Sequence, residues 1–115
     1  MKTTIAIGNH NVEMVANAAS PIFFKRAFKE DFHLLRQKLS AGDTDNPETA
    51  VGIAELFTKM GYIMSKQAVK DFPEASEDDF VAWLTQFAPA DMDASNEAIV
   101  LFYHQSEKGT VVPKP

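Results

Sequence analysis

The sequence predicts a mainly α-helical (α+β) domain in which an N-terminal β-hairpin precedes about four packed helices. Three observations support this prediction. β-prone residues surround a Gly-Asn pair near the N-terminus, apolar residues recur every three or four positions through most of the remaining chain, and proline twice follows a capping residue. The 115 residues suffice for one modest core. We expect a single domain over residues 1–108 and a flexible tail over residues 109–115.

The hairpin is expected at about residues 3–16. Residues 3–7 and 12–16 are short β-prone runs, and the four residues GNHN at 8–11 include glycine and asparagine, which tolerate the positive φ of tight turns. Two strands alone are marginally stable in water, so one face must lie on helices. We expect that face to consist of Ile5, Ile7, Val12 and Met14.

Ser20-Pro21 predicts the start of a first helix, since serine can cap a helix and proline is tolerated at its first position. Its apolar stripe is predicted to continue through one helix as far as Leu39. The members of this stripe are Phe24, Phe28, Phe32, Leu35 and Leu39.

Asn46-Pro47-Glu48 predicts a second helix that runs to about residue 70. Gly52 and Gly61 lie inside this helix, where each costs about 1 kcal/mol relative to alanine. Close crossing of another helix would offset that cost, and a bend or break near Gly61 is the alternative. We favour the crossing.

Ser76 and Asp79 have the spacing of a capping box, which predicts a short third helix after a linker at residues 72–75. This helix presents one apolar, mostly aromatic side and ends before Pro89. That side consists of Phe80, Trp83, Leu84 and Phe87. A fourth helix is predicted from about residue 94 to residue 105, with Ile99, Leu101 and Phe102 packed inward.

No motif for catalysis or metal binding emerges. Cysteine is absent, the glycines are scattered, and the three histidines lack the spacing that places two ligands on one helix face. Asp91, Asp93 and Ser95 imitate the opening of a calcium loop, but Asn96 stands where that loop needs glycine and Phe102 where it needs glutamate. We therefore expect no enzymatic activity, cofactor or metal.

Charge and hydropathy restrict the location and the partners. The N-terminus lacks a signal-peptide core, and no apolar run reaches membrane-spanning length, so we expect a cytoplasmic protein with no membrane partner. The net charge of −5 opposes nucleic-acid binding. Charge is also uneven, at +3 over residues 25–38 and −7 over residues 71–93. These opposite charges suggest head-to-tail self-association between copies as a hypothesis.

Two groups of residues are candidates for protein binding. The charged group would lie off the apolar stripe of the first helix, although an ordinary solvated face explains it as well. Its members are Lys25, Arg26, Lys29 and Arg36. Nine Phe, five Met and one Trp could leave a surplus that forms an apolar groove, although core packing explains most of them. From this group we consider Phe23, Trp83 and Phe102 as exposed anchors.

The order of these elements resembles the tail assembly chaperones of long-tailed bacteriophages of Gram-positive hosts. Two segments carry the resemblance: the run ANAASP at residues 16–21 leading into FKRAFKED at 24–31, and the acidic-aromatic run DFVAWLTQF at 79–87. The similarity spans residues 12–105. The sequence departs from the family pattern at Lys29, where a small residue, often glycine, is common, and at Phe102-Tyr103, where a tryptophan is common.

The resemblance implies a function in virion assembly. A member of this family binds the long helical tape measure protein in the host cytoplasm and keeps it soluble until tail tube subunits polymerise around it. A longer form, made by ribosomal frameshifting, would also contact the tail tube protein. A small helical protein-protein adaptor without catalytic activity is the alternative, and a small hydrolase is a third hypothesis from another class.

Overall fold

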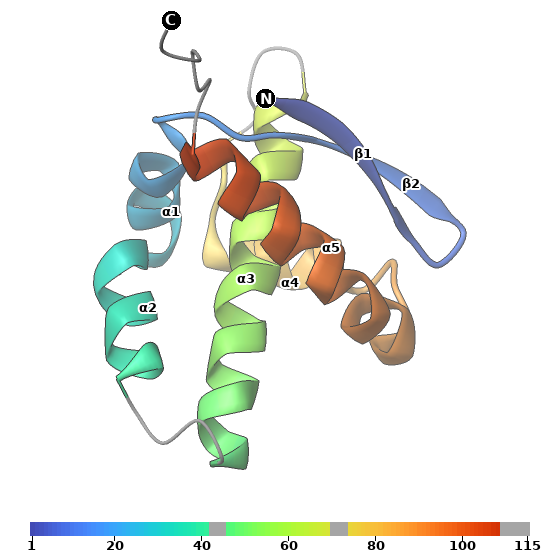
Figure 1. Ribbon diagram of the computed structural model, residues 1–115. Coiled ribbons are helices and arrows are strands. Elements are labelled where there is room, and N and C mark those ends of the chain that lie inside the picture. The colour runs from blue at the N-terminus through green and yellow to red at the C-terminus, as the bar shows by residue number, and fades with distance from the viewer. Residues whose placement is uncertain (42–45, 70–73, 109–115) are drawn as a thin grey trace, which may run out of the picture.

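A computed structural model describes residues 1–41, 46–69 and 74–108 of the chain. Its fold confirms the predicted mainly helical domain with an N-terminal hairpin (Figure 1). The described elements, in order, are β1 (Lys2–Ile7), β2 (His10–Val15), α1 (Ser20–Phe28), α2 (Phe32–Ser40), α3 (Pro47–Gln67), α4 (Glu77–Leu84) and α5 (Pro89–Lys108). The predicted tail at 109–115 and part of the predicted linker lie outside the described residues.

The hairpin forms at the predicted place, but its loop is shorter than predicted, because His10 and Asn11 belong to β2. Gly8 has a φ of 60° in the loop between β1 and β2, and the antiparallel register pairs Ile5 with Val12. The expected inward face is confirmed, since Ile5, Ile7 and Met14 are buried and Val12 is partly buried. The hairpin lies across α3 and α5, which gives two otherwise marginal strands an apolar support (Figure 1).

Helix α3 is the central element of the fold. Helices α1 and α2 pack on one side of it and α5 packs on another, as Figure 1 shows. The side chains of Phe24, Phe32, Met60, Ile63 and Ile99 are almost wholly shielded from solvent in the core that these helices share. Among the described residues, no helix combines the length and the apolar character that crossing a membrane requires.

The prediction of one continuous first helix is wrong, because two helices occupy this segment. Helix α1 ends at Phe28, and Lys29 then adopts a left-handed φ of 60° with its N–H donating to the carbonyl of Lys25 at 2.8 Å. Asp31 caps α2 by accepting a hydrogen bond from the N–H of Leu34 at 2.9 Å. The turn keeps Phe28 and Phe32 in one aromatic cluster with Phe24.

Ser20 begins α1 as predicted but does not cap it. Its hydroxyl accepts from the N–H of Asn17 at 3.1 Å and donates to the side-chain oxygen of Gln67 at 2.7 Å. The N-cap position belongs to Ala19, which makes no side-chain cap hydrogen bond. The buried Ser20 therefore ties the start of α1 to the end of α3.

The two glycines of α3 lie where other helices approach closely, which confirms the favoured interpretation. A Cβ atom at Gly61 would lie 3.0 Å from Cδ1 of Ile99 on α5, and one at Gly52 would lie 2.9 Å from Cδ2 of Leu39 on α2. Helix α3 continues through both positions without a break.

Helix α5 begins earlier than predicted. Pro89 is its first residue, so this proline starts a helix, whereas the sequence analysis treated it only as a stop signal. Asp91, Asp93 and Ser95 consequently lie in a helix and form no calcium loop. Ile99 is buried as expected, but Leu101 is 58% exposed, so its predicted inward packing is wrong.

Candidate functional site

An apolar groove of about 490 Å³ opens between the first half of α3, helix α4 and the first turns of α5. Three segments that are distant in the sequence thus meet at one surface. The residues that line the groove are Val51, Ala54, Glu55, Thr58, Phe80, Leu84, Phe87, Pro89, Met92 and Asp93. Val51 is 65% exposed at its edge, so apolar surface extends beyond the groove itself.

The position of α4 depends on Tyr62, which α3 contributes. The hydroxyl of Ser76 caps α4 by accepting from the N–H of Asp79 at 3.0 Å. The hydroxyl of Tyr62 accepts from the N–H of Ser76 at 3.1 Å and donates to Oδ2 of Asp79 at 2.6 Å. Tyr62 therefore completes the predicted capping box from outside α4, and this link holds the start of α4 on α3.

Lys66 strengthens the same link, because its Nζ lies 2.6 Å from Oδ2 of Asp79. Hydrogen bonds from Lys66 and from Tyr62 lower the pKa of Asp79. Burial raises the pKa of Tyr62, and its hydrogen bond to Asp79 adds to that effect. At neutral pH the carboxylate of Asp79 is thus ionised and the phenol of Tyr62 is protonated.

Aromatic rings behind α4 shape the back of the groove. The ring of Phe80 is centred 5.4 Å from those of Phe28 and Tyr62, and the ring of Trp83 is centred 5.0 Å from that of Phe87. These contacts fix the orientation of α4, and Leu84 then lines the groove.

The groove carries negative charge. Glu55 and Asp93 are its charged lining residues. Glu55 has a long contact of 3.7 Å with Lys59, and Asp93 forms no ion pair with the described part of the chain. An apolar groove with acidic edges suits an amphipathic helix whose apolar stripe is flanked by Lys or Arg.

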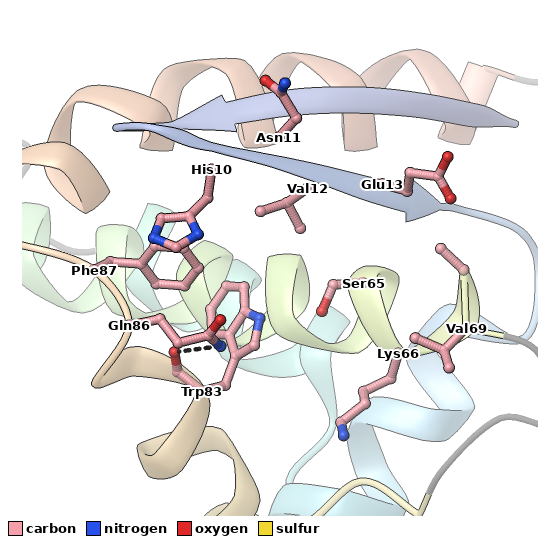
Figure 2. A pocket seen from close by; sticks show the side chains of 11 residues that line it. His10, Asn11, Val12, Glu13, Ser65, Lys66, Val69, Trp83, Gln86 and Phe87 are labelled. Carbon is pink, nitrogen blue, oxygen red and sulfur yellow. Dashed lines mark hydrogen bonds between the residues drawn. The ribbon is translucent and has the colours of Figure 1, made fainter.

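A second hollow, of about 380 Å³, lies next to the groove between β2, the end of α3 and α4 (Figure 2). Its lining mixes apolar and polar side chains, and Phe87 borders both hollows. The ring of His10 packs edge-on against Phe87 with centroids 5.2 Å apart, and the hydroxyl of Ser65 donates to the carbonyl of Tyr62. His10 and Ser65 therefore contact other groups and do not form a nucleophile-base pair with each other.

The structure brings three of the four predicted basic residues together. Lys25, Arg26 and Lys29 are exposed on and just after α1. The guanidinium of Arg26 lies 5.8 Å from the centre of the Phe23 ring. Glu74, part of the acidic segment, lines the same hollow, of about 420 Å³, as Arg26 and Lys29. One residue of the acidic segment therefore shares a hollow with the basic face of the same molecule, and the predicted attraction between copies stays a prediction.

Arg36 lies apart from the other three. Its guanidinium forms a two-pronged ion pair with Glu107 of α5, at 2.6 and 2.7 Å, and also lies over the ring of Phe32. Arg36 lowers the pKa of Glu107 through this hydrogen bonding. These contacts give Arg36 a role in holding α2 against α5.

The three aromatic candidates differ in exposure. Phe23 and Trp83 are partly buried, and Trp83 lines the second hollow. Phe102 is only 6% exposed, so the expectation of an exposed anchor there is wrong. The sequence analysis raised an apolar groove but did not locate it, because Leu84 has the spacing of a core position and Met92 lay in a segment that was not assigned to a helix.

Comparisons with known proteins add no assignment, since no family model, curated protein or solved structure matches the chain. Within residues 1–41, 46–69 and 74–108, no three His, Asp or Glu side chains are grouped so that they could hold a metal ion.

Proposed function

We propose that this chain is a bacteriophage tail assembly chaperone that binds the tape measure protein and keeps it soluble during tail assembly. The observation that carries the proposal is the apolar groove between α3, α4 and α5, with Val51 exposed at its edge and acidic residues in its lining. A groove of this kind suits an amphipathic helix. An unassembled tape measure protein offers many such helical segments.

The turn after α1 explains the position where this chain departs from the family pattern. The family resembled by the sequence commonly has a small residue, often glycine, where this chain has Lys29. That position has a left-handed φ of 60°, which glycine adopts at no steric cost. The family preference therefore has a physical reason in this fold, although the chain itself carries a lysine.

In this function each copy would cover one apolar stretch of the tape measure protein in the host cytoplasm. Weak binding per copy suffices when many copies bind one long partner. A longer form made by frameshifting would bring the tail tube protein to the complex. A general helical adaptor without catalytic activity remains the alternative. Binding to a partner other than the tape measure protein would favour that alternative.

The proposed function implies a long helical tape measure protein encoded near this chain. Co-expressing the chain with that protein and measuring how much of it stays in the supernatant tests the proposal. Val51→Glu introduces a charge at an exposed helical position, so the fold should persist while the apolar edge is lost. We expect the unsubstituted chain to keep the partner soluble and Val51→Glu to leave most of it in the pellet.

Ile22→Glu is the matched control, because Ile22 is similarly exposed but lies on α1, away from the groove. It should protect the partner as well as the unsubstituted chain does. Loss of protection with Ile22→Glu and not with Val51→Glu would move the binding surface to the basic face of α1. A partner that stays insoluble with the unsubstituted chain would contradict the proposed function.

A further inference from the structure

The outer face of α5 carries a regular exposed stripe. Its positions alternate in steps of three and four residues, the spacing of a coiled-coil seam. The stripe consists of Asp91, Ala94, Ala98, Leu101, Gln105 and Lys108, all of which are exposed. Leu101, at 58% exposure, is a large and mostly exposed apolar side chain near the middle of a 20-residue helix.

A hollow of about 430 Å³ lies beside this stripe, between β1 and α5. Ile5 and Thr3 line it from the hairpin, and Ala94, Ala98 and Leu101 line it from α5. The alanines leave room that a larger side chain from outside could fill. Asp91, at the N-terminal end of the stripe, lies beside the turn between β1 and β2, since a Cβ atom at Gly8 would lie 2.4 Å from its carboxylate oxygen.

The stripe is complementary to itself when its direction is reversed. In an antiparallel pair of α5 helices centred between Ala98 and Leu101, Asp91 faces Lys108 of the second copy, and Ala98 faces Leu101 of the second copy. Each Leu101 then enters the hollow beside the alanines of the other chain. A parallel pair would instead place Asp91 against Asp91 and Lys108 against Lys108, which is repulsive at both ends.

We propose that the chain forms a two-fold symmetric homodimer through antiparallel packing of α5, with Leu101 of each copy in the hollow between β1 and α5 of the other. The contact is isologous, so an Asp91–Lys108 pair forms at each end of the interface. This interface is distinct from the groove between α3, α4 and α5. The dimer is therefore independent of the proposed chaperone function, and a dimeric chain keeps both grooves open.

Light scattering on the purified full chain over a range of concentrations tests the dimer. We expect a concentration-dependent shift from monomer to dimer mass, and Leu101→Glu should weaken dimerisation at least about tenfold by burying a charge at the centre. Leu34→Glu, at a similarly exposed position on α2, should leave the dimer unchanged. A monomer at every concentration, or equal effects of the two variants, would overturn the proposal.

Cysteine pairs test the antiparallel orientation, because the chain contains no cysteine of its own. Ala94→Cys and Gln105→Cys chains mixed together should form a disulfide-linked heterodimer under mild oxidation. Either variant alone should not, since residue 94 and its own copy would lie about 16 Å apart along the helices. Linking within each single variant, without linking in the mixture, would contradict antiparallel packing.

Discussion

Lys29 shows how one residue can divide a helix without interrupting its apolar stripe. The chain turns at a left-handed φ of 60°, a conformation that costs a residue with a Cβ about 1 kcal/mol or more. Phe28 and Phe32 still meet Phe24 in the core, because the turn brings both rings back to the same side. The lysine side chain donates to the carbonyl of Arg26 at 3.0 Å, which closes the turn.

We expect Lys29→Gly to stabilise the protein by about 0.5–1 kcal/mol, because glycine adopts the left-handed conformation without strain. Lys25→Gly, four residues earlier inside α1, should destabilise it by about 1 kcal/mol. Urea unfolding of both variants measures the two free energies. Destabilisation of similar size at both positions would contradict the assignment of the turn.

Tyr62 is the residue that joins α4 to α3. We expect Tyr62→Phe to destabilise the protein by about 1–3 kcal/mol, because the N–H of Ser76 and the carboxylate of Asp79 both lose a hydrogen-bond partner. Thermal unfolding followed by circular dichroism measures the loss. Tyr103→Phe is the control, since no hydrogen bond from that hydroxyl is among the described contacts, and it should change stability less.

At the scale of elements, the two glycines of α3 should respond differently to substitution. Gly52→Ala should stabilise the protein by about 0.5–1 kcal/mol, because the opposing atom is the end of the partly buried Leu39 side chain, which can move. Gly61→Ala meets two methyl groups of the fully buried Ile99, at 3.0 and 3.3 Å, and should gain less or lose stability. Chemical denaturation compares the two, and an equal gain at both sites would contradict the close crossing at Gly61.

The sequence predicted the elements best where capping and turn residues were explicit. Gly8 and Asn9 located the hairpin, Asn46 and Pro47 the start of α3, and Ser76 the start of α4. The break after Phe28 escaped prediction, because a spacing of four residues to Phe32 suits one continuous helix equally well. Pro89 was interpreted as a stop, although proline is also favoured at the first position of a helix.

At the scale of the whole molecule, acid should reduce stability through Asp79 and Glu107. Their partners lower both pKa values in the folded state, so the stabilisation is complete above the unfolded values near 4 and is lost as the pH falls through the folded values. We expect the melting temperature to fall progressively below about pH 5.

Glu107→Gln isolates one part of that acid dependence. The substitution should lower stability at pH 7 by about 0.5–1 kcal/mol and make the loss below pH 5 shallower, because one of the two carboxylates no longer titrates. Glu97→Gln, at an exposed position on the same helix, should leave the pH profile unchanged. If stability depended on pH in the same way in both variants, Glu107 would not contribute to the loss of stability in acid.

The position of the groove could not be predicted from the sequence, because its walls come from three segments that only tertiary packing brings together. Val51, Leu84 and Met92 each have the spacing or composition of a core residue, and no local pattern marks which of them remains accessible. The charge asymmetry was visible in the sequence, but the sequence did not show that Glu74 lines one hollow together with Arg26 and Lys29 of the same molecule.

The most direct test of the chaperone function is the mass of the species that the purified chain forms with the co-expressed tape measure protein. Size-exclusion chromatography with light scattering gives that mass and hence the number of copies bound. The groove predicts a defined complex of several chains on one tape measure protein, which Val51→Glu abolishes. A tape measure protein that elutes alone, while this chain keeps the mass that it has by itself, would contradict the function proposed here.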